Sequence, residues 1–465
     1  MNTAWMTYPQ QFRAVLTLGL PLIGGHLAQF AIGLTDTIML GWYGAESLAA
    51  LTLATAFFFV FFLMGCGFAW AVMPLVAQAA ASDDTQTVRR VTRMGLWLSG
   101  LYWAAVMPLL WFSGAILLAL GQTEALAADA QTYLRIAGFG MLPALLVMVL
   151  KSYLAALERT RVVLLVTVLA AIANGMGNYA LIFGNWGAPE LGIAGAAIAA
   201  ILSQLTALVA IAVYTQRRMP QHAMFQRFWR ADPQMFARVF RLGVPIGLTT
   251  LAEVGLFEAT AIMMGWLGTV PLAAHGIALQ TASATFMVHL GFGNVATIRA
   301  GNALGRNDPE HLARGARTVL GLSLAMSLMT IALFLTLPHL LVGAFIDPAD
   351  PAREAIVATG VTLLAVAALF QLVDGAQVVA LGILRGMQDT RVPMIMAIAA
   401  YWGVGIPASY VFGFVLGGEA VGIWLGAVFG LTLAALAMLW RFWGQSLPGM
   451  RGQNAGHLAP ATDPH

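Results

Sequence analysis

Long apolar runs separated by short polar breaks constrain this chain more than any other feature. A helix needs about 20 apolar residues to cross a bilayer, and the runs are long enough for twelve spans. Runs such as Leu53 to Gly65 do not alternate between apolar and polar residues, as the strands of a transmembrane barrel would. The spans are therefore expected to be helices, near residues 14–41, 48–80, 94–119, 131–154, 162–184, 191–215, 240–268, 272–298, 318–343, 355–384, 392–416 and 420–442.

Composition points to the same fold class. Only 9% of the 465 residues are charged and 60% are hydrophobic, whereas a soluble protein carries about 25% charged residues. This balance excludes a soluble enzyme, a nucleic-acid-binding protein and a disordered protein. The single cysteine, Cys66, excludes an intramolecular disulfide and a CxxC metal or redox site, so its expected role is packing.

Basic residues predict how the spans are oriented, because cytoplasmic loops are enriched in arginine and lysine. If the N-terminus is inside, only Arg135 and Arg353 fall in outside segments. The other basic residues lie at cytoplasmic ends, among them Arg89, Arg90 and Arg93. Both termini are therefore expected in the cytoplasm.

An internal repeat divides the chain. The sequence LGLP at 18–21 recurs as LGVP at 242–245, and the pair GW at 41–42 recurs at 265–266, both 224 residues later. A shared offset across proline, glycine and tryptophan predicts a duplication. Each repeat holds six spans, an even number, so the two repeats run parallel, as in one class of secondary transporters.

The predicted fold is thus an all-α integral membrane protein with twelve transmembrane helices in two parallel six-helix repeats. The basic segment near residues 217–241 is the longest polar connection and the natural linker. The expected parts are a cytoplasmic N-terminus (1–13), an N-lobe (14–215), a cytoplasmic linker (216–239), a C-lobe (240–442) and a disordered cytoplasmic tail (443–465).

Four carboxyl groups lie within spans, where an ionisable side chain costs about 2.5–3.5 kcal/mol on insertion scales. They are Asp36, Glu253, Glu258 and Asp374. The alternative for each carboxyl group is a structural hydrogen bond, and this alternative is stronger for Glu258 than for the other three. Charged groups that persist in a membrane span usually serve ion or substrate pathways, so these carboxyls are the candidate functional residues.

Asp36 has two expected amide partners. Asn174 and Asn178 are four residues apart and so lie on one helix face, at a depth that matches Asp36. One carboxylate and two amide oxygens suit a hard cation or a proton. Interhelical hydrogen bonding by the two asparagines is the alternative.

Glu253 and Asp374 are expected to face one cavity. Two acidic groups in one cavity raise each other's proton affinity, so the pair is expected to hold a proton or a monovalent cation. An organic cation arriving at the same charge would displace it, which is the simplest physical basis of antiport. The offset of 224 maps Asp36 onto Thr260 and Glu253 onto Gln29, so each repeat presents one acid on the same helix stripe at a different height.

Aromatic and proline residues add weaker expectations. Phe257, Phe286 and the phenylalanines of 57–62 are candidates for holding a flat lipophilic cation by cation–π contact, although packing or lipid contact is the more common role. Pro21 and Pro245 are candidate hinges in equivalent helices. The histidines show no ligand spacing, so no metal cluster is expected beyond possible Na⁺ at the acidic sites, and no cofactor is expected.

Several separated motifs carry a family resemblance. They are GLTDTIMLG with Asp36, NGMGNYALIFG with Asn174 and Asn178, LGVPIGLTTLAEVGLF with Glu253, AAHGIALQ, and FQLVDGAQVVALGILRGMQDTRVP with Asp374. Over roughly residues 10–445 the chain resembles the multidrug and toxic compound extrusion (MATE) family, in particular its NorM-type bacterial branch.

The resemblance implies a drug/cation antiporter with two lobes and a central V-shaped cleft. In that branch the matches of Glu253 and Asp374 form the acidic site of the C-lobe. The match of Asp36, with the two asparagines, forms the site of the N-lobe. Glu258 departs from the bacterial pattern and looks more like eukaryotic members, so it either widens the acidic surface or makes an interhelical contact.

The leading interpretation is a secondary active antiporter of the bacterial inner membrane, monomeric and not an enzyme. It would export amphipathic organic cations in exchange for inward Na⁺ or H⁺, with membrane lipids as its surroundings and no nucleic acid as partner. The sequence has no GxxxxGK[ST] phosphate loop, so transport must use a gradient. A lipid-linked precursor flippase is the alternative, and a channel or membrane scaffold is a second one.

Overall fold

The computed structural model describes residues 6–43 and 45–458. Within these residues the backbone is helical nearly throughout and forms no strand, which confirms the all-α fold class. Eleven of the described helices are long and apolar enough to cross a membrane. A further long helix, α9 (Thr269–Gly305), corresponds to the expected span 272–298 and is more polar because it carries His275, Gln280 and His289. Each of the twelve expected spans therefore has a helix.

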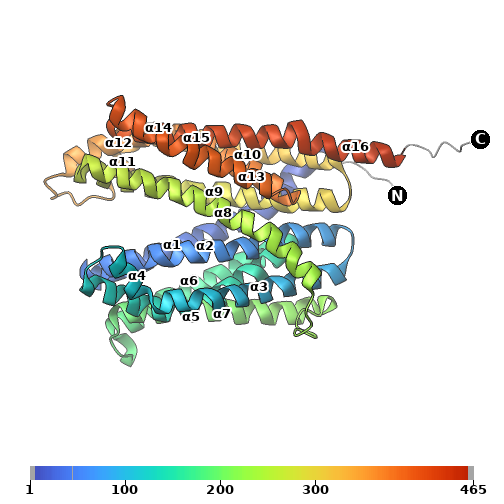
Figure 1. Cartoon of the computed structure of the whole chain (residues 1–465), viewed down its shortest axis with the longest axis horizontal. Coiled ribbons are helices and arrows are strands. Elements are labelled where there is room, and N and C mark those ends of the chain that lie inside the picture. Colours follow the sequence, from blue (N-terminus) through green and yellow to red (C-terminus); the bar gives the residue numbers. More distant parts are fainter. Residues whose placement is uncertain (1–5, 44, 459–465) are drawn as a thin grey trace, which may run out of the picture. The chain divides into compact units, whose positions relative to one another are not determined.

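The chain divides into two compact units, Gly24–Leu248 and Met1–Ile23 with Thr249–His465. In the first unit α5 packs against α2, α3 and α7, and α6 packs against α7 (Figure 1). Asp84 caps the start of α3 by accepting a 2.9 Å hydrogen bond from the Thr87 amide. The helices that lie wholly in this unit are α2 (Ala45–Ala81), α3 (Thr85–Trp111), α4 (Ser113–Ala119), α5 (Glu124–Ala156), α6 (Thr160–Phe183) and α7 (Gly192–Arg218), with the short turns η1 (Asn185–Gly187) and η2 (Pro220–His222).

In the second unit α12 packs against α9, α10 and α15. Besides α9, its helices are α10 (Pro309–Thr336), α11 (Pro338–Gly343), α12 (Arg353–Gly386), α13 (Arg391–Ile398), α14 (Ile406–Tyr410), α15 (Glu419–Arg441) and α16 (Leu447–Leu458). Three π-helical segments join some of them, namely η3 (Ala399–Gly405), η4 (Val411–Val415) and η5 (Phe442–Ser446). Pro407 lies two residues after the end of η3 and has no N–H to donate to the preceding turn.

Two helices contribute to both units. The division falls inside α1 (Tyr8–Tyr43) after Ile23 and inside α8 (Pro233–Leu267) after Leu248. Both helices continue through their prolines, Pro21 and Pro245, which lie just before these two points. The lobe and linker boundaries stay predictions, because the compact units are cut within helices and not within loops.

Close contacts at glycines attach the first half of α1 and the first half of α8 to their compact units. A Cβ built on Gly67 of α2 would lie 2.5 Å from the carbonyl oxygen of Gly243 on α8, and one on Gly291 of α9 would lie 2.4 Å from Ile23 Cγ1 on α1. Gly67 and Gly291 are 224 residues apart, as are Ile23 and Gly247, which also contacts the Cβ position of Gly67. The repeat seen in the sequence therefore has a counterpart in helix packing.

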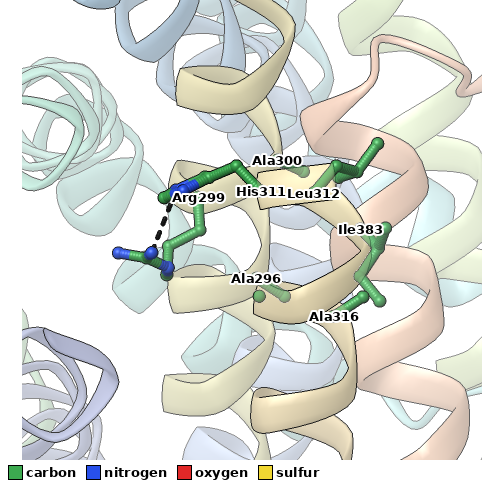
Figure 2. A pocket seen from close by; sticks show the side chains of 8 residues that line it. Ala296, Arg299, Ala300, His311, Leu312, Ala316 and Ile383 are labelled. Carbon is green, nitrogen blue, oxygen red and sulfur yellow. Dashed lines mark hydrogen bonds between the residues drawn. The ribbon is translucent and has the colours of Figure 1, made fainter. Parts of the chain in front are cut away.

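Polar side chains also tie the first half of α1 to its unit. Gln11 is fully buried and contacts both Arg299 of α9 and His311 of α10. Figure 2 shows Arg299 and His311 beside a cavity of about 10 Å³, which has room for about one water molecule. The Arg299 guanidinium and His311 Nε2 are 3.0 Å apart. This end of α1 is held by specific hydrogen bonds as well as by apolar packing.

The segment expected as a disordered tail is helical from Phe442 as far as Leu458. Phe442 is fully buried, and Arg317 of α10 lies 5.4 Å from the ring centre of Trp443. Arg451 also forms a 2.5 Å ion pair with Glu310. These contacts bind residues 442–451 to α10, and the disorder expected of the tail stays a prediction. Residues 459–465 of the expected tail, like residues 1–5 of the expected N-terminus, lie outside the described residues.

Candidate cation-binding sites

The first candidate site joins α1 and α6 within the unit Gly24–Leu248. Asn178 Nδ2 donates to Asp36 Oδ1 at 2.5 Å and to Asn174 Oδ1 at 3.3 Å. Both asparagines are fully buried and Asp36 is half-buried. The three residues that the sequence grouped by depth and helix face are therefore brought together, and are called the Asp36 cluster below.

Two polar atoms of the Asp36 cluster have no hydrogen-bond partner among the described residues. They are Asn174 Nδ2 and Asn178 Oδ1. Buried polar atoms are rarely left unpaired, so a free amide oxygen beside a carboxylate is a place where a cation would be stabilised. Carboxylate and amide oxygens are the ligands that hard cations prefer.

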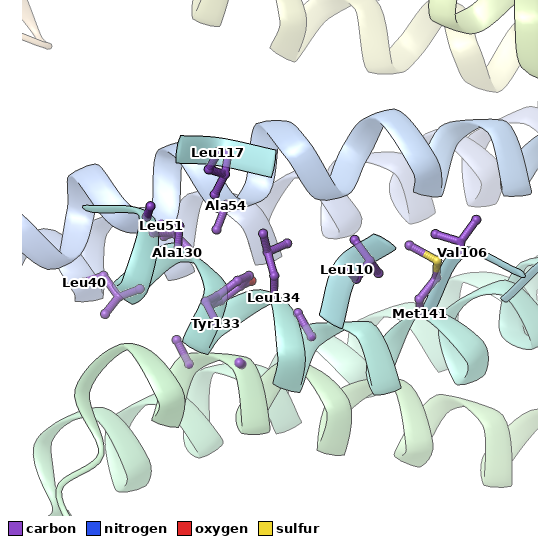
Figure 3. Close-up of a cluster of buried hydrophobic side chains, with 14 of the residues drawn as sticks. Leu40, Leu51, Ala54, Val106, Leu110, Leu117, Ala130, Tyr133, Leu134 and Met141 are labelled. Atoms are coloured by element: carbon purple, nitrogen blue, oxygen red, sulfur yellow. The ribbon is translucent and has the colours of Figure 1, made fainter. Parts of the chain in front are cut away.

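A hydrophobic core positions this cluster. Met39 and Leu40 follow Asp36 on α1 and pack with residues of α2, α3 and α5. Tyr133 of α5 belongs to this core (Figure 3) and is close enough to interact electrostatically with Asp36. The core therefore fixes the turn of α1 that carries Asp36, and the carboxyl group lies at its edge.

The second candidate site lies in the other unit and joins α8, α12 and η3. Glu253 of α8 and Asp374 of α12 interact electrostatically, and both interact with Tyr401 of η3. Gln377 Nε2 donates a 2.7 Å hydrogen bond to the Tyr401 hydroxyl. Asp374, Gln377 and Tyr401 are fully buried. These four residues are called the Glu253 cluster below.

Four oxygen atoms of the Glu253 cluster have no hydrogen-bond partner among the described residues. They are Glu253 Oε1, both carboxyl oxygens of Asp374, and Gln377 Oε1. Two carboxylates that share a buried region repel each other, and a cation or a proton between them relieves that repulsion. The donor set is all oxygen, which suits a hard cation.

One basic residue lies near this cluster. Arg385 of α12 interacts electrostatically with Glu253 and with Tyr401. It forms no ion pair within 4.0 Å with either acid in the part of the chain that is described. Two carboxylates and one guanidinium leave a formal charge of minus one, so the region favours a cation over an anion.

Sequence reasoning missed three residues here: Gln377, Arg385 and Tyr401. A helical signal was present for two of them, because residues three and eleven positions after Asp374 return to its helix face. Tyr401 belongs to another element, and no spacing in the sequence relates it to the acids. Only the packing of η3 on α15 and the hydrogen bond from Gln377 reveal it.

The remaining predicted residues lie elsewhere. Glu258 is exposed and, five residues after Glu253, points about 140° away from it. Phe257 contacts Phe370 with ring centres 5.8 Å apart, and Phe286 is partly buried. Phe57 to Phe62 contact one another, with Phe57 and Phe61 centred 5.3 Å apart. Their suggested part in substrate binding stays a prediction. No group of three His, Cys, Asp or Glu that could hold a metal ion occurs among the described residues.

Known proteins resemble this chain over most of its length. The family model described as MatE matches residues 21–180 and 245–411. The two matches begin 224 residues apart, which is the offset of the repeat. The duplication inferred from short motifs is therefore supported by an independent comparison.

Several curated relatives share one name. A protein of Rhizobium meliloti called "Probable multidrug resistance protein NorM" is 45% identical over 438 residues, 94% of each chain. Proteins of the same name are 42% identical in Agrobacterium fabrum, over 94% of each chain, and 35% identical in Synechocystis sp., over 92% of this chain and 94% of the relative.

Solved structures share the fold. A MATE protein in complex with MaL6 superposes with a TM-score of 0.86 at 19% identity, covering 95% of this chain and 97% of its own. The eukaryotic MATE transporter AtDTX14 superposes with a TM-score of 0.85 at 18% identity, covering 97% and 99%. The family resemblance predicted from the motifs is confirmed: the chain belongs to the MatE family, whose members are transporters and not enzymes.

Proposed function

We propose that the protein is a secondary active multidrug antiporter that exports amphipathic organic cations in exchange for inward Na⁺ or H⁺. The observation that carries this proposal is the Glu253 cluster, with four buried oxygen atoms that lack a partner among the described residues and two carboxyl groups near a single arginine, Arg385. The relatives named as multidrug resistance proteins favour a drug as the exported substrate.

Competition for one negative charge would couple the two fluxes. Glu253 and Asp374 would hold the coupling cation until an organic cation reached the same region. The drug would then neutralise the carboxylate charge that the coupling cation had neutralised, and the coupling cation would leave. The site would hold either the coupling cation or the drug, and never both. Exchange of the two would therefore be obligatory as the two lobes alternate access between the sides of the membrane.

The Asp36 cluster would be a second site for the coupling ion. Asn178 holds one carboxyl oxygen of Asp36 by a hydrogen bond, and the amide oxygen of Asn178 lacks a partner among the described residues. Na⁺ or a proton at Asp36 would draw on these oxygens. Each repeat would thus contribute one acidic site to the cycle.

Other residues have supporting roles in this proposal. Glu258, Phe257 and Phe286 would contact the organic cation together with Glu253 and Asp374. Pro21 and Pro245 would act as hinges, since α1 and α8 pass from one compact unit to the other just beyond them. The protein would work as a monomer in the inner membrane, with both termini in the cytoplasm.

The flippase alternative predicts a cationic cavity for a pyrophosphate group. The Glu253 cluster has the opposite charge, with Arg385 outnumbered by two acids, which favours the cation antiporter. A channel would conduct without a gradient of a second ion. Electrical recording in planar bilayers separates that case, because an antiporter shows no conductance that is independent of exchange.

The direct test measures cation-driven efflux of a dye cation from proteoliposomes. Asp374→Asn and Glu253→Gln are expected to abolish coupled efflux while the protein still folds. Glu354→Gln is the matched control, since Glu354 is an exposed acid on the same helix as Asp374. Undiminished coupled efflux in both cluster variants would overturn the proposal.

The coupling ion needs a separate measurement. Efflux driven by an inward sodium gradient at equal pH on both sides is compared with efflux driven by a pH gradient in sodium-free buffer. The gradient that supports uphill export of the dye identifies the ion. If neither gradient supports uphill export, the antiport mechanism is wrong.

A further inference from the structure

A basic pocket lies in the unit Gly24–Leu248 and is lined by none of the residues of the Asp36 cluster. It has a volume of about 450 Å³, within the range of small-molecule sites. It is formed by the start of α3 and the segment that leads into α8. Its charged lining residues are Arg89, Arg90, Arg93, Arg227, Arg230 and Asp232.

The positive charge of this pocket is only partly compensated. Arg90 forms an ion pair with Asp232, with N–O distances of 2.5 and 3.2 Å. The other four arginines form no ion pair within the described part of the chain. Four guanidinium groups that converge on one pocket repel one another, so an anion there would be stabilised.

Arg93 provides a second, independent indication. Its side chain is 6% exposed, and its terminal nitrogen donates to the backbone oxygens of Gln226 and Arg227. Its Nε is buried and has no hydrogen-bond partner among the described residues. A buried guanidinium that still has a donor to offer is suited to a phosphate or carboxylate oxygen.

Two helices begin beside the pocket, and each N-terminus already has a carboxylate cap: Asp84 for α3 and Asp232 for α8. The pocket includes Gln86 in the first turn of α3, which begins at Thr85, and Pro233, the first residue of α8. A helix N-terminus carries partial positive charge and attracts anions. Arginines in the first turns of α3 therefore oppose the helix dipole, and a bound anion would offset this.

Aromatic residues place the pocket at the membrane surface. Trp97 of α3 is exposed, donates a 2.8 Å hydrogen bond to the Phe228 carbonyl and stacks on the Phe228 ring. Trp229 is 77% exposed. Tryptophan is enriched where the hydrocarbon core meets the headgroups, and the basic residues assign this end to the cytoplasmic side.

We propose that the basic pocket binds the phosphate headgroup of an anionic phospholipid of the cytoplasmic leaflet. Arg89, Arg93, Arg227 and Arg230 contact the phosphate oxygens, and the tryptophans contact the glycerol and upper acyl region. Basic pockets beside transmembrane helices on this side of a membrane suit such headgroups. A soluble phosphate compound would meet the same arginines, so the experiment must separate the two sources.

The equivalent location in the second repeat is occupied by protein. The offset of 224 relates Gln86 to Glu310 and Arg93 to Arg317. There Glu310 is paired with Arg451, and Arg317 lies against Trp443. The segment 442–458 thus supplies contacts that the first repeat leaves to a ligand, and the proposed lipid site belongs to the first repeat.

Native mass spectrometry of the full-length, delipidated protein tests this proposal. The protein is titrated with cardiolipin, phosphatidylglycerol or phosphatidylcholine. The triple variant Arg89→Gln/Arg227→Gln/Arg230→Gln leaves the buried Arg93 in place. The matched control is Arg161→Gln/Arg217→Gln/Arg218→Gln, three exposed arginines of the same unit that do not line the pocket. Size-exclusion chromatography and thermal unfolding verify that both triple variants fold.

Anionic lipids are expected to bind the wild type more tightly than phosphatidylcholine. The pocket variant should bind them about 100-fold more weakly, since each basic residue near an anionic lipid contributes about 1 kcal/mol. The control triple variant should bind like the wild type. Asp232→Asn, which removes the one acid of the pocket, should bind at least as tightly as the wild type.

Two results would overturn the proposal. One is equal binding of anionic lipid by the wild type and the pocket variant. The other is binding of inorganic phosphate or glycerol 3-phosphate at the same affinity as the lipid, with full displacement of the lipid, which would make the ligand a soluble phosphate. Neither result depends on transport, so the outcome is separate from the proposed antiport.

Discussion

The amide nitrogen of Asn178 on α6 donates a 2.5 Å hydrogen bond to the carboxyl oxygen of Asp36 on α1. The two residues are 142 positions apart in the chain, and their bond crosses between two membrane-spanning helices. Such a bond fixes the rotation of α1 against α6, because the alternative is an unpaired amide in a buried place. It also orients the carboxyl group that would receive the coupling ion.

Asn178→Ala is expected to lower the free energy of unfolding by about 1–3 kcal/mol, because it removes the buried donor to Asp36 and the bond to Asn174. Thermal unfolding in lipid nanodiscs measures the effect. The matched control is Gln122→Ala, an amide in the loop between α4 and α5, which should change stability by less than about 0.5 kcal/mol. Equal stability of the two variants would contradict the importance of the Asp36–Asn178 bond.

Tyr401→Phe is expected to destabilise the protein by about 1–3 kcal/mol, because Gln377 then loses the hydroxyl acceptor of a buried 2.7 Å hydrogen bond. Gln377→Leu removes both the donor and the free amide oxygen. A double-mutant cycle of these two changes should show a coupling free energy of about 0.5–3 kcal/mol. Additive effects in the cycle would mean that the Gln377–Tyr401 bond does not contribute.

Gly67→Ala is expected to destabilise the protein by about 1–3 kcal/mol, because the added methyl group overpacks the contact with the α8 backbone. Gly100→Ala on α3 is the control, since nothing lies within 4 Å of a Cβ built there. Alanine is the better helix former, so the control should gain up to about 1 kcal/mol. The changes in stability of the two variants should therefore have opposite signs, as measured by their thermal unfolding midpoints. Equal shifts of the midpoint in the two variants would contradict close packing of α2 on α8.

Because Asp232 is paired with Arg90, we expect the free energy of unfolding to depend on pH. The hydrogen bond from Arg90 lowers the pKa of Asp232 below its ordinary value of 3.8. A lowered folded-state pKa contributes stability that is fully present above the ordinary value and is lost as pH falls through the lowered one. Asp232→Asn keeps a side-chain oxygen for the 3.1 Å bond from the Met235 amide, so it tests the ion pair alone.

At pH 7 the Asp232→Asn variant should be about 1 kcal/mol less stable than the wild type, the upper range for a partly exposed ion pair. The difference should shrink as pH is lowered below 3.8. Asp129→Asn, at an exposed position on α5, should match the wild type at every pH. A constant difference between Asp232→Asn and the wild type over this range would show that the ion pair is not its source.

Much of the fold was predictable because each span can be recognised from residues that are close together in the chain. A helix in a bilayer satisfies its own backbone hydrogen bonds, so a run of apolar residues is enough to locate it. Other features depend on residues that are far apart in the sequence. The start of α8 at Pro233 and the packing of Trp443 involve partners such as Arg90 and Arg317, which lie far away in the chain.

The Asp36 cluster was also predictable, because Asn174 and Asn178 share a helix face and match Asp36 in depth. The Glu253 cluster was predictable only in its acids. Tyr401 reaches it from a π-helical segment, and no periodicity in one helix encodes a neighbour on another. For the same reason the sequence did not predict the basic pocket, in which arginines from α3 and from the segment before α8 converge.

The sequence by itself determined the membrane class, the twelve spans, the duplication and the short set of acids within the bilayer. These properties follow from transfer free energy and helix periodicity, which act on residues close together in the chain. The tertiary structure alone decided that Tyr401 meets Gln377, and that four arginines without an ion pair among the described residues converge on one pocket. Those encounters depend on how helices pack, and packing is set by contacts such as Gly67 with Gly243 that join distant parts of the chain.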